Sequence, residues 1–287
     1  MSYLQESIRC KGAQICSPFV RDVRGTSVVG YVSSGTGDVY AITEGKHVVW
    51  THTGGDPRGA AFDSHGKLHI ADCAHAAILK ADVSAHTHQP GLVVKVYEEK
   101  PFRGPSSIQI APTGVVYFTD SGPLGETTLA EPRGSVFCIA HGPSGGQVLK
   151  PLALDCLAHP CGLAVSPNSK LIYVAEMMHN RLLRFVQRPT GIYHCTVFHQ
   201  FAGGMGPSCV ACDADGRIYV GMFDVAGGAD EHGKIYILSH AGTIEHVLQV
   251  PGQEITGLCI EPSTRALFVT EASGNALHCI ALDAIFK

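Results

Sequence analysis

The sequence lacks the features that mark several broad classes of protein. Only 16% of its residues are charged and the formal net charge is −4, so it has no basic excess for binding nucleic acid. No apolar run approaches the roughly 20 residues needed to cross a bilayer. The N-terminal segment MSYLQESIRCKG also has no apolar stretch typical of a secretory signal. We therefore expect a cytoplasmic protein that binds neither nucleic acid nor a membrane.

Disulfide and metal motifs are scarce as well. Eleven cysteines is an odd number in a chain without an export signal, which favours reduced thiols over a disulfide framework. There is no HExxH motif. The closest cysteine pair, Cys209 and Cys212, lies inside an apolar strand pattern and has no partner pair elsewhere. No metal centre is therefore indicated by spacing.

Glycine, proline and an internal repeat are what the sequence does have. The 33 glycines and 16 prolines are spread along the chain, as expected for many short strands joined by turns. One phrase recurs roughly every 40–50 residues: a strand, a turn with Gly or Pro, and a more apolar strand that usually ends in Asp or Glu. It reads DPRGAAFDSHGKLHIAD from Asp56 and GPSSIQIAPTGVVYFTD from Gly104. A third strand, and often a fourth, follows each copy.

Six such copies predict an all-β fold, a six-bladed β-propeller with four antiparallel strands per blade. We expect one domain over residues 1–287, with segment 7–14 supplying the missing strand of the last blade. The residue just before each inner strand should reach the axis, which gives a first ring of Cys16, Arg58, Ser106, Cys161, Ser208 and Thr256. The ends of the second strands should form a second ring on the same face: Ser33, Asp72, Asp120, Glu176, Met222 and Glu271.

Two passages carry a family resemblance over essentially the whole chain. HPCGLAVSPNSKLIYVAEMMHNRLLRF from His159 and FTDSGPLGE from Phe118 resemble the six-bladed family of senescence marker protein, gluconolactonase, paraoxonase-type lactonases and strictosidine synthase. The strictosidine-synthase-like branch is the most similar. The resemblance implies a small-molecule pocket at the channel mouth and hydrolase-like chemistry on a lactone, ester or related metabolite. The alternative is a non-catalytic propeller that binds a protein or a metabolite.

The resemblance also bears on calcium. Lactonase members hold this ion in the channel through acidic and Asn residues, and the matching positions here are Cys16, Ser106, Cys161 and Ser208. Hydroxyls and thiols are poor ligands for a hard cation, so we expect no metal and no other cofactor. Strictosidine synthase also departs from the metal site and uses a glutamate near the inner strand of its last blade. By resemblance, Glu254 is then a candidate catalytic acid or base.

The carboxylates of the second ring allow two interpretations. They could raise one another's pKa and act as acid and base, or they could accept backbone hydrogen bonds and anchor the blades. Within this ring, Glu176 and Asp120 are our catalytic candidates, beside Glu254, because long loops follow them. The loops 122–133 and 224–233 should overhang the same face, and the second could act as a mobile cover.

The candidate substrate-binding residues are Arg58, Ser106, Ser107, Cys161, Ser208 and Thr256. Arg58 could bind a carboxylate or phosphate in bidentate fashion, or could instead pair with Asp72 or Asp56. Cys161 and Cys16 could act as a nucleophile or bind a soft metal, with His159 as the only histidine nearby. Alternatively, these thiols are small buried apolar groups.

Overall fold

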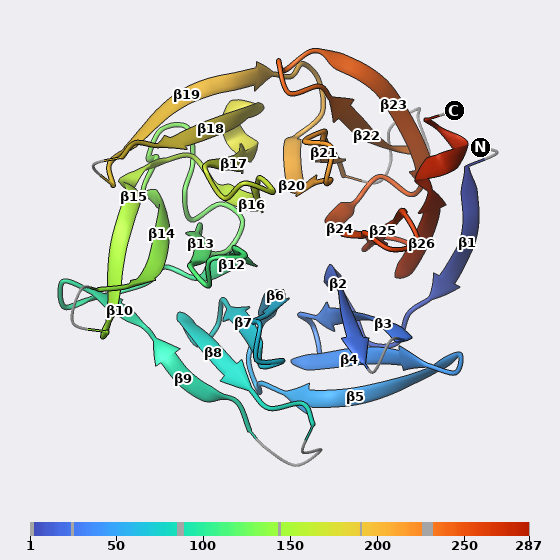
Figure 1. Ribbon diagram of the computed structural model, residues 1–287, viewed down its shortest axis with the longest axis horizontal. Helices are drawn as coiled ribbons and strands as arrows, with labels where there is room; N and C mark the ends of the chain where they lie inside the picture. Colours follow the sequence, from blue (N-terminus) through green and yellow to red (C-terminus); the bar gives the residue numbers. More distant parts are fainter. Residues whose placement is uncertain are drawn as a thin grey trace.

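The computed structural model describes residues 3–23, 26–84, 89–142, 145–189, 191–225 and 232–286. Its strands form six four-stranded antiparallel sheets that stand as blades around a common axis, which confirms the predicted all-β, six-bladed propeller (Figure 1). Within the described residues the only helices are two 3-10 turns, η1 (Met177–His179) and η2 (Leu282–Ala284). No helix in this part of the chain is long and apolar enough to cross a membrane.

Each of the first five blades is built from four strands in chain order, and the first strand is innermost (Figure 1). Blade one contains β2 (Ile15–Val23), β3 (Thr26–Ser33), β4 (Asp38–Thr43) and β5 (Lys46–His52), and blade two contains β6 (Pro57–Phe62), β7 (Leu68–Asp72), β8 (Ala77–Ala81) and β9 (Gly91–Val94). Blade three contains β12 (Pro105–Ile110), β13 (Val116–Asp120), β14 (Gly134–His141) and β15 (Gln147–Leu157), and blade four contains β16 (Pro160–Val165), β17 (Leu171–Glu176), β18 (Arg181–Gln187) and β19 (Tyr193–Gln200). Blade five contains β20 (Gly206–Cys212), β21 (Ile218–Phe223), β22 (His232–Leu238) and β23 (Ile244–Pro251). The strands β10 (Val96–Tyr97) and β11 (Lys100–Pro101) form a separate hairpin.

The last blade closes the ring with a strand from the N-terminus, as predicted. It consists of β24 (Ile255–Glu261), β25 (Ala266–Glu271), β26 (Ala276–Ala281) and β1 (Leu4–Arg9). The closing strand covers residues 4–9 rather than the predicted 7–14. The reason is that Asn275 donates hydrogen bonds to the carbonyls of Cys10 (3.1 Å) and Gly12 (2.9 Å), where the chain leaves this blade for the next.

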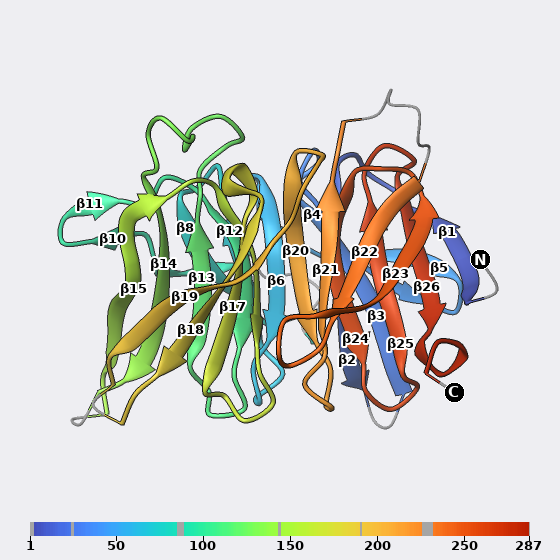
Figure 2. The same ribbon diagram turned by 90° about the horizontal axis from the view of Figure 1, so that it is seen from above.

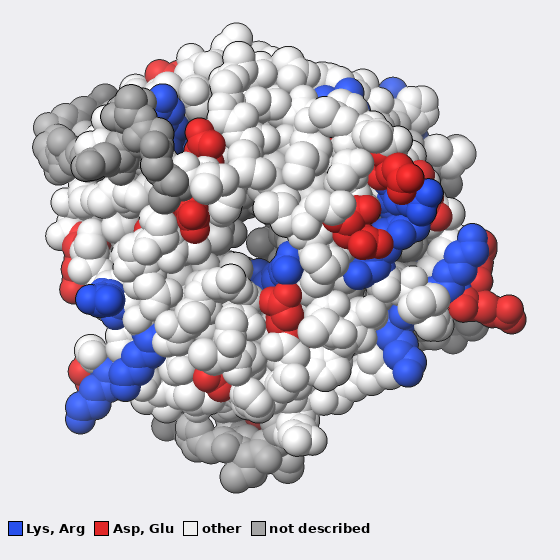
Figure 3. Space-filling model, turned by 180° about the vertical axis from the view of Figure 1, so that it is seen from behind, with Lys and Arg blue, Asp and Glu red and all other residues white. Residues whose placement is uncertain are grey.

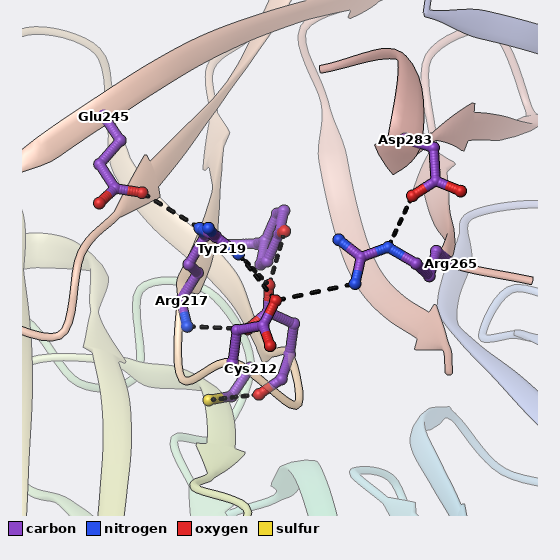
Figure 4. A network of polar contacts seen from close by, with 8 residues as sticks. Cys212, Arg217, Tyr219, Glu245, Arg265 and Asp283 are labelled. Atoms are coloured by element: carbon purple, nitrogen blue, oxygen red, sulfur yellow. Dashed lines mark hydrogen bonds and ion pairs between the residues drawn. The ribbon is translucent and has the colours of Figure 1, made fainter. Parts of the chain in front are cut away.

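A network of charged side chains joins blades five and six to the C-terminal turn (Figure 4). Asp215 contacts both Arg217 (3.0 Å) and Arg265 (3.7 Å), and Arg265 also binds Asp283 at 2.7 Å. The guanidinium of Arg217 lies 4.2 Å from the centre of the Phe286 ring. Because most of these side chains are exposed, each pair stabilises the fold only slightly. Together they hold the C-terminal segment against the blades.

A β-bulge near the start of each inner strand turns side chains toward the axis. The pairing with the second strand slips between Cys16 and Phe19, Pro57 and Gly59, Pro105 and Ile108, Pro160 and Gly162, Pro207 and Cys209, and Ile255 and Gly257. A bulge leaves residues unpaired and re-aims their side chains. The residues of the predicted first ring therefore lie inside the inner strands, at or beside the bulge, rather than just before the strands.

Gly162, directly after one bulge, allows two inner strands to approach closely. A Cβ at this position would lie 2.6 Å from Cα of Cys209 and 2.8 Å from the carbonyl oxygen of Ser208. We expect Gly162→Ala to lower the free energy of unfolding by about 1–3 kcal/mol, because the backbones must move apart. Urea denaturation measures this. The control is Gly146→Ala, where a Cβ meets no atom within 4 Å, and equal effects of the two variants would contradict the steric explanation.

Candidate functional site

One cavity of about 270 Å³ brings the first ring together at the axis. Its lining includes every candidate substrate-binding residue, namely Arg58, Ser106, Ser107, Cys161, Ser208 and Thr256, together with Cys16. A space-filling view shows a hollow at the centre of one face, with basic and acidic side chains side by side at its edge (Figure 3). Rigid inner strands from all six blades thus meet around a space large enough for a small molecule.

Most hydroxyl and thiol groups of this ring are used to connect neighbouring blades. Ser208 Oγ donates to the Ile255 carbonyl at 2.5 Å, and Thr256 Oγ1 donates to the Ile15 carbonyl at 2.7 Å. The other connections run from Ser106 Oγ to the Cys161 carbonyl (3.5 Å), from Cys161 Sγ to the Pro207 carbonyl (3.5 Å), and from the Leu163 N–H to Ser107 Oγ (3.1 Å). The donors of Ser106, Cys161, Ser208 and Thr256 are therefore committed to the protein, whereas Ser107 Oγ acts as an acceptor.

Arg58 is the exception in the ring. Its Nε and Nη2 donate to the same oxygen, Oδ2 of Asp56, at 3.0 and 2.9 Å, so pairing with Asp56 is observed. A guanidinium has five N–H donors, and the other three have no partner among the described residues. Arg58 is also the only Lys or Arg that lines the cavity in the described chain. Cationic donors thus remain available to a ligand despite the ion pair.

The channel thiols are held in the protonated form. Burial raises the pKa of Cys16 to about 11 and that of Cys209 to about 12. Burial raises the pKa of Cys161 as well. The nucleophilic form of cysteine is the thiolate, which is scarce at neutral pH when the pKa is this high. The thiols therefore match the description of small buried apolar groups better than that of nucleophiles.

The second ring does not line this cavity, which corrects the expectation that it converges at the channel mouth. Glu176 is fully buried and accepts hydrogen bonds from the Ala158 N–H (2.8 Å) and from Nε of Arg181 (2.6 Å). Asp120 accepts the N–H groups of Arg103 (3.0 Å) and Gly104 (2.8 Å). Asp72 and Glu271 accept backbone N–H groups in the same way. These carboxylates turn back to the loop that enters the inner strand of their own blade, as the anchoring interpretation predicts.

Of the three candidate catalytic carboxylates, only Glu254 lines the cavity. Its N–H donates to Oε1 of Glu271 at 3.1 Å, and its carbonyl accepts the N–H of Ala272 at 2.9 Å. The carboxylate itself makes no hydrogen bond with the described residues. An anchored backbone therefore presents a partly exposed, unpaired carboxylate to the cavity.

Apolar side chains from three blades complete the lining. Leu124, Met177 and Phe223 all line the cavity. Leu124 and Met177 lie in the segments after Asp120 and Glu176 that were expected from the sequence to face a ligand, whereas Phe223 was not identified. Leu124 belongs to the loop between β13 and β14, which rises above the face of the disc (Figure 2). Phe223 is the last residue of β21, and the repeat marks this strand end without revealing that its side chain lines the cavity. Of the second predicted loop, residues 226–231 lie outside the described residues, and with them the proposed cover.

His159, which the sequence placed only as a histidine near the cysteines, also lines the cavity. It is 4% exposed, and its backbone has a positive φ of 57°. Thr127 Oγ1 accepts its N–H at 3.1 Å, and its carbonyl accepts the N–H of Met177 at 3.1 Å. Burial lowers the pKa of His159 to about 4, and the charge of Arg58 adds to this effect.

This histidine should make the stability of the protein depend on pH. The pKa is about 6.5 in the unfolded chain and about 4 in the folded one, so acid favours the unfolded state. The stabilisation is fully present above pH 6.5 and is lost as the pH falls toward 4, by about 2–3 kcal/mol between pH 7.5 and 4.5. Urea denaturation of the wild type and of His159→Gln at several pH values measures this. An unchanged pH slope in the variant would contradict the assignment to His159.

Comparison with known proteins decides the family. Residues 32–273 match the family described as SMP-30/Gluconolactonase/LRE-like region. The chain belongs to this family. It is 26% identical over 178 residues to Protein STRICTOSIDINE SYNTHASE-LIKE 7 of Arabidopsis thaliana, covering 60% of this chain and 46% of that protein. It is 27% identical over 145 residues to Lactonase drp35 of Staphylococcus haemolyticus, covering 49% of this chain and 40% of that protein.

The chain thus spans less than half the length of these two curated relatives. Among solved structures it is similar to a gluconolactonase from Xanthomonas campestris, with a TM-score of 0.76 and 20% identity over 95% of this chain and 87% of that one. At this identity the likeness shows a shared fold.

The calcium site implied by the SMP-30/gluconolactonase family can be tested against the donors present. Calcium takes six to eight oxygen ligands, with carboxylates prominent among them. The cavity lining offers one carboxylate, that of Glu254. The hydroxyl groups of Ser208 and Thr256 donate to neighbouring blades, and Arg58 adds a positive charge. In the chain as described, no group of three or more His, Cys, Asp or Glu is arranged to hold a metal. These residues do not fit a hard divalent cation.

Proposed function

We propose that this member of the SMP-30/gluconolactonase family hydrolyses a lactone, ester or related small metabolite at the mouth of its channel. One observation carries the proposal. An unpaired carboxylate, Glu254, and a cation with unused donors, Arg58, line the same cavity of about 270 Å³. A lactonase among the relatives and a gluconolactonase among the similar structures support the choice of reaction.

The chemistry follows from these two side chains. Glu254 accepts a proton from a water molecule as the water oxygen attacks the substrate carbonyl carbon. N–H groups of Arg58 donate to the carbonyl oxygen, where negative charge develops. The C–O bond of the ester or lactone then breaks, and the leaving oxygen takes the proton from Glu254. A lactone yields a hydroxy acid, whose apolar carbons contact Leu124, Met177 and Phe223.

The reaction as proposed needs no metal or cofactor, and its partner is a small molecule. We also propose that the protein acts in the cytoplasm. Its described cysteines are all free, which suits a reducing compartment.

Hydrolysis of a substrate panel tests the proposal. The panel contains γ-butyrolactone, δ-valerolactone, glucono-δ-lactone and p-nitrophenyl acetate, each with EDTA or with 1 mM CaCl₂. We expect turnover of at least one compound at a rate that EDTA does not change, and a melting temperature that calcium does not raise. Absence of turnover across the panel contradicts the hydrolase. Loss of turnover in EDTA contradicts only the metal-independent mechanism.

A second candidate is a non-catalytic propeller that binds a metabolite or a protein. The inter-blade hydrogen bonds of Ser208 and Thr256 favour it, because these channel side chains serve the architecture. Saturable binding of a panel compound without turnover would support this alternative over the hydrolase.

A further inference from the structure

His159 is a buried histidine whose hydrogen bonds are incomplete. Its Nδ1 is buried without a partner, and Nε2 has no hydrogen bond with any described residue. His278 is buried to a similar degree, yet its Nδ1 contacts Ser7 Oγ at 2.8 Å and its Nε2 contacts the Pro251 carbonyl at 3.2 Å. Buried polar groups nearly always find partners. An unpaired imidazole in the wall of a cavity therefore points to a missing ligand.

The fold holds this imidazole in place although the backbone of His159 adopts an unfavourable conformation. A positive φ of 57° is unfavourable for a residue with a Cβ. Thr127 of the loop between β13 and β14 and Met177 of η1 fix the two peptide groups of His159. Glu176 fixes the preceding residue through the N–H of Ala158. Two separate segments, the loop that contains Thr127 and the turn at 176–177, thus position one side chain that lines the cavity.

The electrostatic surroundings decide which form of the imidazole a ligand would meet. Burial and the Arg58 charge keep the pKa of His159 at about 4, so the ring is neutral at pH 7 and carries one N–H. Nδ1 is buried and has no acceptor, so the proton is less costly on Nε2. His159 then offers the cavity a hydrogen-bond donor without a charge.

We propose that His159 Nε2–H and the free N–H groups of Arg58 form one recognition site for the carboxylate of a small hydroxy acid. Both side chains line the same cavity, and Leu124 and Phe223 supply an apolar wall for the carbon chain. The inference rests on the proposed function, because such an acid is the product of lactone hydrolysis. When the lactone substrate is bound, the same donors face its carbonyl oxygen.

The experiment uses 5-hydroxypentanoate, the open form of δ-valerolactone, as the probe. Titration is followed through the ¹⁵N resonances of the histidine rings at pH 7. We expect the His159 nitrogens to shift on saturation, while those of His278 stay in place. Pentane-1,5-diol, which lacks the carboxylate, should cause no shift at the same concentration. Unmoved His159 resonances at saturation overturn the proposal.

Two variants of similar shape separate the hydrogen bond from the packing of the ring. His159→Gln keeps an N–H near the position of Nε2, whereas His159→Met removes it, and both carry the same backbone strain. We expect Kd for the probe to rise at least tenfold in His159→Met and in Arg58→Gln, and to stay within about threefold in His159→Gln. The control His278→Gln should not change Kd. Equal affinity of the Met and Gln variants overturns the role of His159.

The results also separate this inference from the proposed function. Turnover of lactones without any binding of the probe overturns the recognition site and leaves the hydrolase standing. Binding of the probe that depends on His159, without turnover of any panel compound, supports the recognition site and contradicts the hydrolase.

Discussion

Replacing Glu254 with Gln is expected to lower kcat/KM for the lactone or ester substrate by at least about 100-fold. The amide cannot accept a proton from the attacking water, and no other carboxylate in the described chain lines the cavity. The free energy of unfolding should change by less than about 0.5 kcal/mol, because the carboxylate makes no hydrogen bond that the variant would lose. A pH-stat assay and urea denaturation measure the two quantities.

The matched control is Glu131→Gln, which neutralises an exposed carboxylate on the loop between β13 and β14. It should leave both activity and stability unchanged. Full activity in Glu254→Gln would contradict its role as the base. A loss of activity accompanied by several kcal/mol of destabilisation would instead show that Glu254 is structural.

The opposite outcome is expected for Glu176. Glu176→Ala should lower the free energy of unfolding by about 3–5 kcal/mol, because a fully buried carboxylate and its partners are separated. The N–H of Ala158 and the guanidinium of Arg181 lose an acceptor at 2.8 and 2.6 Å, and His179 loses one at 2.8 Å. Urea denaturation measures the change. Glu176→Gln keeps one acceptor oxygen, so its free energy of unfolding should lie between those of Glu176→Ala and the wild type.

Destabilisation below about 1 kcal/mol in Glu176→Ala would contradict the anchoring role assigned to this carboxylate. The comparison with Glu254 is direct, since both are glutamates that the sequence proposed as catalytic. Substitution of Glu176 should mainly lower stability, and substitution of Glu254 should mainly lower turnover.

Glu176 and Asp120, which do not line the cavity, show where sequence reasoning ended. Their position at the end of a second strand was correct, because the repeat reveals strand ends. The direction of their side chains depends on which N–H groups the preceding loop leaves unpaired. Those donors, at Ala158 and Gly104, lie 18 and 16 residues earlier and become neighbours only when the blade folds.

The sequence did not reveal that His159 is buried in the wall of the cavity, for a related reason. A single histidine before a proline carries no periodic signal, and its burial depends on a loop from the neighbouring blade. Thr127, which fixes its backbone, lies 32 residues away in the chain. The unpaired Nδ1 is visible only when all surrounding side chains are in place.

By itself, the sequence determined the six blades and the residues that meet at the axis, because strand periodicity and recurring turns are local properties that repeat along the chain. Only the tertiary structure decided what those residues do. It assigned the hydroxyls to neighbouring blades, paired Arg58 with Asp56, turned one ring of carboxylates away from the cavity and left Glu254 and His159 facing it. These outcomes depend on hydrogen-bond partners that lie in different blades or different turns, and such partners come within reach only when the ring closes.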